Sequence, residues 1–317
     1  MSDIYTTTYK RWKKRDKITA ELVQNVPVKK KAFAESGLIE YSSYENTDVT
    51  EITSVLADLG SYYYVLLGQA VGESLKEGAF VTTDYEKVYS SLRLLNACHL
   101  FWHIYFNETS RGQHKLARID EYDLFIYVVM SVFYSKKEFA TASSIAFYAL
   151  NKELVFFFGE FRKAATQKFI FKLTAQFHGH TSKEIEQLDL YEPLFDELLN
   201  HWDDEDPSLV LNELLLKACY RHTHHSRDGN SKEGFDFEFI GVHHFPLEIL
   251  FIFRLREWRG LAMPTVEHPI MAPPFNTLPK ETEPTYSDEL IDGVYARIRH
   301  DWPNFDSTLE DVRTLYF

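Results

Sequence analysis

The sequence has few cysteines and no long apolar run. Cys98 and Cys219 are its only two cysteines, and both lie in apolar helical contexts far apart in the chain. We expect them to be buried free thiols in a reducing compartment. No stretch of about 18 uncharged apolar residues predicts a transmembrane helix. The N-terminus has no apolar segment after its basic residues, so a secretory signal is not expected either. These absences predict a cytoplasmic protein with no membrane partner.

Motifs of the common catalytic sites are absent as well. The chain has no Gly-x-Ser-x-Gly elbow, Walker loop, dinucleotide-binding glycine fingerprint or Cys-x-x-Cys pair. It also has no His-Glu-x-x-His, and no Glu-x-x-His of the kind that helical di-iron sites use. We therefore expect no enzyme, no cofactor and no resident metal.

Thirteen histidines leave one alternative in the class of enzymes. His222, His225, His243 and His244 could form a metal site in a helical metal-dependent enzyme. The simpler interpretation is that these imidazoles lie at loop edges and helix ends and hydrogen-bond to backbone carbonyls or acids. A helical scaffold protein, whose aromatic helices pack in an oligomer such as a homodimer, is the third alternative.

Apolar residues recur at helical spacing along most of the chain, which predicts an all-α fold. Leu154 to Phe161 continues in helical style, and Phe235 to Val242 gives the only weak strand signal. The expected helices cover residues 50–72, 83–107, 120–133, 138–150, 169–177, 184–190, 193–202, 208–223, 246–259 and 287–301.

We expect this multi-helix array to have two helical halves. A basic N-terminal arm covers residues 1–47, an N-terminal helical region covers 48–180, and a C-terminal helical region covers 181–317. Between Pro264 and Pro284 there are six prolines, a density that neither a helix nor a central strand tolerates. Residues 264–284 should therefore run extended before the last helix.

The predicted helix at residues 246–259 is the centre of the C-terminal region. Pro246 suits a first helical turn because its missing N–H would have no partner there. Apolar residues from Leu247 to Leu255 cover nearly every side of the helix, so it should be buried. Gly260 fits the position that ends a helix in a left-handed conformation.

Charge is distributed unevenly along the chain. Residues 1–31 carry a balance of +6, whereas the remaining residues carry −19. Such a body repels nucleic acid and attracts basic surfaces. The basic arm could touch nucleic acid, but terminal charge runs are usually solvated or fold back onto acidic surface, so no nucleic-acid partner is expected.

The densest acidic stretch lies between Glu184 and Asp206, which holds ten Asp and Glu and no Lys or Arg. A solvated helix face is the simple interpretation. The functional interpretation is a docking surface for a basic protein, in which Tyr191 and Trp202 supply apolar anchors. The predicted partner-binding residues are Tyr191, Asp196, Glu197, Trp202, Asp203, Asp204, Glu205, Asp206, Asp228, Glu233, Asp236 and Glu238.

The second half resembles the immunity proteins of bacterial polymorphic toxins, in particular the all-helical type that neutralises PoNe-class DNase effectors of type VI secretion. The resemblance is closest over residues 205–262, where a helix ending in histidines leads to a polar loop, an aromatic segment and an apolar helix. These are Leu209 to His225, Ser226 to Asp236, and Phe239 to Leu250. The resemblance implies an antitoxin that binds and blocks a cognate toxin, here a basic nuclease of the type VI or contact-dependent kind.

Overall fold

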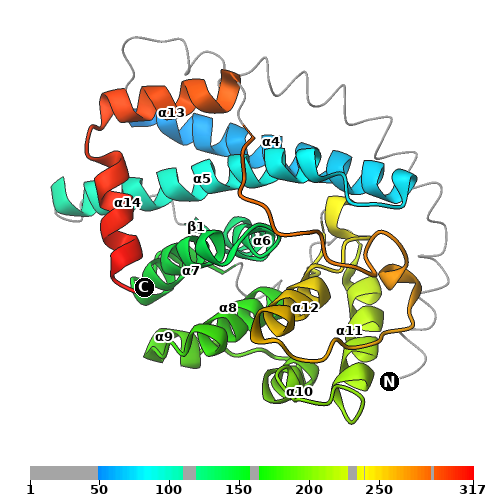
Figure 1. Cartoon of the computed structure of the whole chain (residues 1–317). Helices are drawn as coiled ribbons and strands as arrows, with labels where there is room; N and C mark the ends of the chain where they lie inside the picture. The colour runs from blue at the N-terminus through cyan, green and yellow to red at the C-terminus, as the bar shows by residue number, and fades with distance from the viewer. Residues whose placement is uncertain (1–48, 110–118, 158–163, 228–233, 239, 287–288) are drawn as a thin grey trace. The chain divides into compact units, whose positions relative to one another are not determined.

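Figure 1 shows the computed structural model, which describes residues 49–109, 119–157, 164–227, 234–238, 240–286 and 289–317. The predicted arm at residues 1–47 lies outside this described part. Helices dominate the described residues, so the predicted all-α class is confirmed. The two strands β1 (Ile119–Asp120) and β2 (Val155–Phe156) pair in parallel over two residues each. None of the described helices is long and apolar enough to cross a membrane.

The described chain divides into two compact units that alternate along the sequence. The first unit contains Leu67–Thr82 and Phe157–Glu281, and the second contains residues 49–66, Thr83–Phe156 and Thr282–Phe317. The boundary predicted near residue 180 falls inside the first unit. Each unit is therefore assembled from segments that are distant in the sequence.

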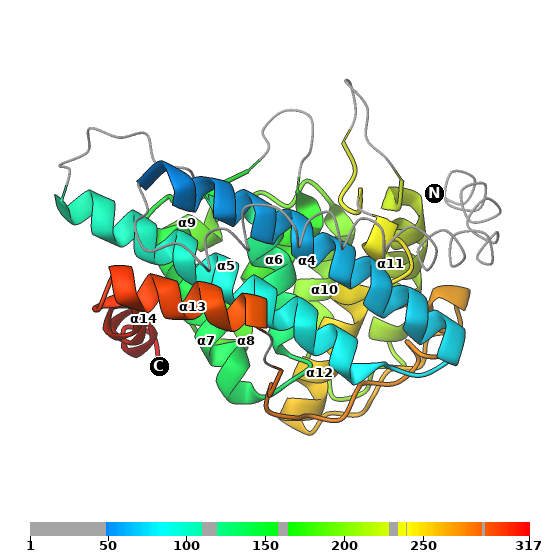
Figure 2. The same cartoon turned by 90° about the horizontal axis from the view of Figure 1, so that it is seen from above.

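The second unit is built from six helices of the described chain. The first part of α4 (Val49–Glu77) and α5 (Thr82–Thr109) run antiparallel as a helical hairpin (Figures 1 and 2). They approach closely where Gly60 faces Leu95. The remaining helices are α6 (Glu121–Ser131), α7 (Lys136–Asn151), α13 (Glu289–Asp301) and α14 (Phe305–Thr314).

Local capping explains where α6 and α7 begin. The Asp120 carboxylate accepts a hydrogen bond from the Tyr122 amide at 2.8 Å, and the Ser135 hydroxyl accepts one from the Glu138 amide at 3.3 Å. Such side chains satisfy N–H groups that the first helical turn leaves without a carbonyl partner. Between these caps, every residue of α6 except Asp123 is buried.

The first unit contains the end of α4, the short 3-10 helices η1 (Ile240–Val242) and η2 (Pro269–Met271), and five further helices. The predicted central helix is α12, in which each residue from Leu247 to Arg256 is buried. Gly260 ends it with a φ of +69°, a conformation that glycine adopts without strain. The other helices are α8 (Ala165–His178), α9 (Lys183–Glu186), α10 (Pro193–His201) and α11 (Leu211–His225).

Two glycines bring α4 and η1 of the first unit together. A Cβ atom on Gly241 would lie 3.0 Å from the backbone nitrogen of Gly68. Gly68 is the first glycine of the Gly-x-x-x-Gly sequence in α4, and only a residue without a side chain permits this approach.

Both cysteines are buried free thiols, as predicted.

Three local predictions differ from the structure. Residues 155–156 form strand β2 rather than continuing a helix, because Ile119 and Leu154 pair through their backbones. The weak strand signal at 235–242 corresponds to an isolated bridge from Phe237 to Ser226 and to η1. Helix α14 was not predicted, so the proline-rich segment precedes two helices rather than one.

Candidate partner-binding surface

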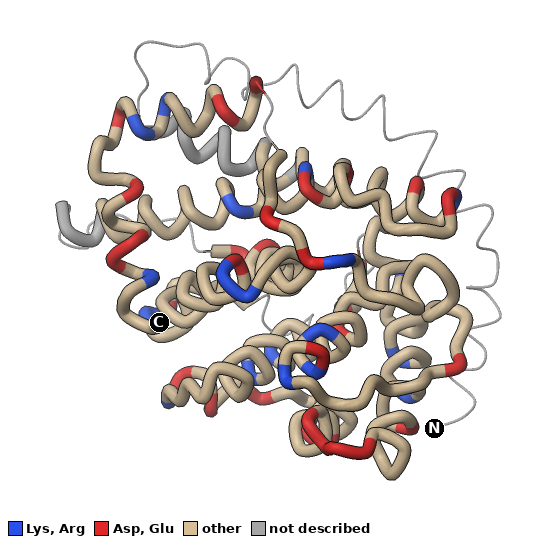
Figure 3. The backbone as a smooth tube through the Cα atoms, in the orientation of Figure 1, with Lys and Arg blue, Asp and Glu red and all other residues tan. Residues whose placement is uncertain are grey.

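A run of acidic residues of the first unit forms the turn after α10 (Pro193–His201; Figure 3), and two more acids lie on α10 itself. Asp196 and Glu197 are exposed on the helix. In the turn, Asp203, Glu205 and Asp206 are exposed and Asp204 is half-buried. We call these six carboxylates the acidic surface.

Aromatic packing fixes α10 beneath this surface. Phe195 is buried and stacks on Phe169 with ring centroids 4.6 Å apart. The Arg221 guanidinium also lies over the Phe195 ring, 4.5 Å from its centroid. The Trp202 indole N–H donates a hydrogen bond to the Gln176 side chain at 3.1 Å. Helix α10 is therefore packed so that the side carrying Asp196 and Glu197 is exposed to solvent.

A buried arginine holds the turn in place. The Arg256 guanidinium donates hydrogen bonds to the backbone carbonyls of Trp202 at 2.6 Å and Asp204 at 2.9 Å. It also donates to the carbonyl of Ala262 at 2.6 Å. Since one guanidinium binds all three carbonyls, the acidic turn and residues 262–263 run side by side.

Few cations of the described chain neutralise the acidic surface. Asp203 lies 3.8 Å from Arg259 and Asp204 lies 2.8 Å from the His201 imidazole. Asp206 accepts hydrogen bonds from the amide and hydroxyl of Ser208, and these bonds lower the pKa of Asp206. Within the described residues, no ion pair involves Asp196, Glu197 or Glu205. The negative charge is therefore available to a partner.

Large apolar side chains are exposed next to these acids. The Leu209 side chain follows the acidic turn directly and is 78% exposed. Met263, which adjoins Ala262 and thus the turn, is 43% exposed. Tyr191 is also exposed, with the Lys168 ammonium 4.6 Å from its ring centroid. Exposed apolar residues beside charged ones are a common feature of protein-binding sites.

Leu209 was not among the predicted partner-binding residues. The sequence pattern placed it inside a helix from residue 208. The structure begins α11 at Leu211 instead, so Leu209 remains in the turn. The proline at 207 is the signal that could have placed the helix start later.

Two predicted partner-binding residues are inside the protein. Trp202 is only 2% exposed and packs against Phe177, so it stabilises α10 and does not reach a partner. Asp236 is buried, and its carboxylate lies 2.5 Å from the Arg221 guanidinium and accepts a hydrogen bond from the Thr166 hydroxyl. Burial alone raises the pKa of Asp236, but Arg221 more than offsets this and holds it below its usual range.

The remaining predicted acids are separate from the acidic surface. Glu238 is half-buried and accepts a hydrogen bond from the Phe235 amide at 2.9 Å. This segment adjoins the C-terminal end of α11, where the Phe237 amide donates to the His225 carbonyl. The acidic turn adjoins the other end of α11, about 20 Å away for a helix of 15 residues. Asp228 and Glu233 lie outside the described residues.

Two of the four histidines in the alternative metal site, His222 and His225, have surroundings that the structure defines in detail. The His222 ring is buried, with Nδ1 3.0 Å from the Glu248 carboxylate and Nε2 3.1 Å from the Val242 carbonyl. Burial, together with the nearby Arg221, lowers the pKa of His225 to about 3. Among the residues that the structure describes, no three His, Cys, Asp or Glu side chains are grouped as metal ligands.

Comparison with protein-family models, curated proteins and solved structures found no match to this chain. Its functional class therefore has to be argued from the fold and the surface alone. The described chain is a mainly helical protein whose acidic surface has exposed apolar residues beside it.

Proposed function

We propose that this protein is an immunity protein, an antitoxin that binds a cognate bacterial toxin with a basic surface and blocks it. The observation that supports this proposal is the acidic turn held by Arg256, with Leu209 and Met263 exposed beside it. The residues we assign to binding are the acidic surface, Tyr191, Leu209 and Met263. The proposal includes a cytoplasmic location, where an antitoxin would meet its toxin.

Electrostatics would make such binding fast. Carboxylates with few cation partners repel one another and weaken the fold, a cost that a use for the field would explain. Complementary charge steers a basic partner and can raise the association rate constant toward about 10⁸–10⁹ M⁻¹s⁻¹ at low salt. A toxin that acts inside its own producer requires a fast inhibitor.

Affinity would come from the apolar residues and from rigidity. Burying one exposed leucine or methionine contributes roughly 1.5–3 kcal/mol, and Leu209 and Met263 lie next to the acids. Because Arg256 already fixes the turn, little conformational freedom is lost when the partner binds.

A nuclease is the toxin class that fits best. Nucleases hold phosphates with Lys and Arg side chains, and the exposed carboxylates of the acidic surface would compete for the same cations. This agrees with the resemblance to immunity proteins of PoNe-class DNases. The toxin would be the product of the neighbouring gene, since toxin and antidote must be produced together.

The test is a binding measurement between this protein and the purified product of that neighbouring gene. A variant with Asp203→Asn, Asp204→Asn, Glu205→Gln and Asp206→Asn should bind at least about tenfold more weakly at low salt. The control variant changes four exposed acids elsewhere, Glu77, Glu153, Glu267 and Glu283, to Gln. It has the same net charge and should bind like the wild type.

The two parts of the proposal can fail separately. Unchanged affinity of the turn variant would remove the acidic surface from the interface. A neighbouring gene product that neither binds this protein nor is inhibited by it would contradict the immunity role itself.

A further inference from the structure

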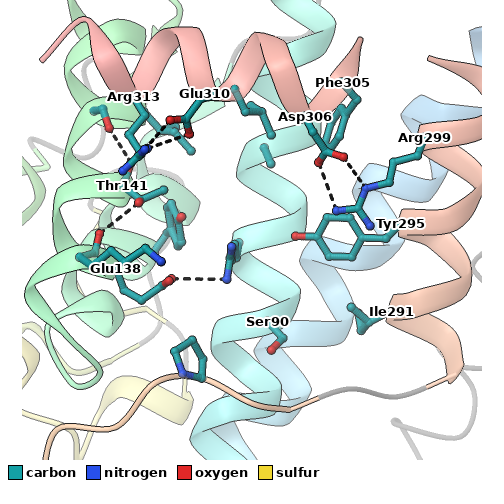
Figure 4. Close-up of a pocket in the computed structure, with 18 of the residues that line it drawn as sticks. Ser90, Glu138, Thr141, Ile291, Tyr295, Arg299, Phe305, Asp306, Glu310 and Arg313 are labelled. Atoms are coloured by element: carbon teal, nitrogen blue, oxygen red, sulfur yellow. Dashed lines mark hydrogen bonds and ion pairs between the residues drawn. The ribbon is translucent and has the colours of Figure 1, made fainter. Parts of the chain in front are cut away.

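The second unit contains a cleft of about 530 Å³. It is lined by α5, α6, α7, α13, α14 and residues 284–286 (Figure 4). Its volume is within the range of small-molecule sites, roughly 300–1,000 Å³. All of the lining residues belong to the second unit, so the cleft is distinct from the acidic surface.

Two of the cations that line the cleft are already neutralised. The Arg299 guanidinium donates to both oxygens of Asp306, at 2.7 and 3.1 Å. The Arg313 guanidinium binds Glu310 in the same bidentate manner (Figure 4). These pairs close one side of the cleft and leave little charge for a ligand.

Arg93 is different. Its guanidinium makes no hydrogen bond to any described residue, and its nearest anion is the Glu138 carboxylate at 3.5 Å. The same Glu138 oxygen already accepts a short hydrogen bond, 2.6 Å long, from the Tyr89 hydroxyl. The Arg93 side chain is 45% exposed, so it is partly withdrawn from water, and its N–H donors form no hydrogen bond to a described residue.

Two further donors line the same cleft. The Lys137 ammonium forms no ion pair within the described part of the chain. The Tyr127 side chain is completely buried, and its hydroxyl has no hydrogen-bond partner among the described residues. Burial raises the pKa of Tyr127, so this hydroxyl stays protonated and can donate. Leaving a buried hydroxyl without a partner costs about 1–3 kcal/mol.

The other walls of the cleft are partly apolar. Figure 4 shows Ile291 and Phe305 at its edge and the Tyr295 hydroxyl pointing into it. Burial raises the pKa of Tyr295 as well, so its hydroxyl is a further protonated donor. Donors next to apolar walls suit a ligand that has an anionic group and an apolar body. The apolar lining residues are Ala97, Ile145, Pro284, Ile291, Phe305 and Leu309.

We propose that this cleft binds a small organic anion, whose carboxylate or phosphate accepts hydrogen bonds from Arg93, Lys137 and Tyr127. Its apolar part covers Ile145, Ile291 and Leu309. The Glu138 carboxylate next to Arg93 repels ligands of high negative charge, which selects a monoanion or dianion over a polyanion such as nucleic acid.

The proposal is tested by calorimetric titration of the full-length protein with two probes, benzoate and phenyl phosphate. Phenol, which has the same ring without the charge, is the neutral comparison. Wild-type protein should bind at least one of the two anions and bind phenol at least tenfold more weakly. Arg93→Gln should weaken anion binding about tenfold or more, because a hydrogen bond to a charged group contributes roughly 1.5–3 kcal/mol. The control Lys152→Gln removes an equal charge from an exposed residue outside the cleft and should bind like the wild type.

A second variant separates ligand binding from folding. Tyr127→Phe deletes the buried hydroxyl without leaving a cavity, so the free protein should be as stable as the wild type or more stable, yet bind the anion more weakly. Binding of benzoate alone assigns a carboxylate ligand, and binding of phenyl phosphate alone assigns a phosphate. If neither anion binds at about 5 mM, a concentration in the range of the dissociation constants of weak complexes, the proposal is wrong. It is also wrong if Arg93→Gln binds the anion like the wild type.

Discussion

The backbone carbonyl of Asp204 accepts a hydrogen bond from the buried guanidinium of Arg256 at 2.9 Å. A residue of the central helix α12 thereby determines the conformation of an exposed turn that is more than 50 residues earlier in the chain. The charge that we assign to partner binding lies on the surface, but the residue that positions it is in the core.

We predict that Arg256→Met weakens both stability and partner binding. The substitution leaves three carbonyls without their donor, which should lower the free energy of unfolding by about 3 kcal/mol or more. Denaturant titration measures this, and amide hydrogen exchange should become faster in residues 203–209 specifically. If the amide exchange rates of residues 203–209 did not change, Arg256 would not be the residue that orders this turn.

Asp236→Asn should destabilise the first unit. The substitution removes the more deeply buried of the two carboxylates that pair with the buried Arg221, the other being Glu192 at 3.1 Å. Breaking a buried pair on one side costs roughly 3–5 kcal/mol, and the remaining Glu192 keeps the loss near the lower value. The matched comparison is Asp203→Asn, whose carboxylate forms only an exposed ion pair with Arg259 and should cost less than about 1 kcal/mol. Equal losses in the two variants would contradict the roles assigned to these two acids.

Asp123 should make the second unit less stable as pH rises toward neutral. Burial, and secondarily the nearby Asp120, raises the pKa of Asp123 to about 7, from a usual value of 3.8. Between these two values the folded protein holds a proton that the unfolded chain releases, so stability falls across this window and is lowest above pH 7. The Tyr63 and Tyr64 hydroxyls, which donate to this carboxylate, limit the effect.

The measurement is the urea midpoint between pH 4 and pH 8. Asp123→Asn should flatten the decline and be more stable than the wild type at pH 8, by at most about 4 kcal/mol. The two proteins should converge near pH 4, where the wild-type carboxyl is protonated in the folded state. The prediction would be contradicted if the urea midpoint of the wild type rose with pH over this window while the midpoint of Asp123→Asn stayed constant.

Gly241→Ala should be destabilising although alanine is small. Its Cβ would lie 3.0 Å from the Gly68 nitrogen, a backbone atom that cannot rotate away, and such overpacking costs typically 1–3 kcal/mol. The control is Gly60→Ala in helix α4, where the nearest atoms would be 3.9 Å from the new Cβ. That change should stabilise the protein by about 0.5–1 kcal/mol, and thermal unfolding compares the two.

Helices with strong local signals could be predicted from the sequence. Apolar residues around the whole of α12 indicated a central helix, and Gly260 marked its end because the left-handed conformation required there favours glycine. Helix α14 is only ten residues long, and its two buried residues, Phe305 and Val312, lie near opposite ends. So short an amphipathic pattern, directly after Pro303, gave too weak a periodicity to be noticed.

The site was harder to predict because burial depends on contacts between distant residues. Trp202 stands among acids in the sequence, which suggested exposure, but Gln176 and Phe177 of α8 cover it. Asp236 was assigned to the surface for its charge, and its counterion Arg221 is 15 residues earlier. Neither the cleft nor the role of Arg93 in it has a sequence signal, since the lining residues come from five helices and one further segment.

The alternation of the two units along the chain restricts how this protein can be dissected. A fragment of residues 181–317 would lack α8 and the end of α4, which belong to the first unit, and would include α13 and α14, which belong to the second. No single cut yields either unit intact. A terminally truncated protein would therefore lose binding because it misfolds, whether or not the interface had been removed. Only point substitutions in the full-length chain can locate the interface.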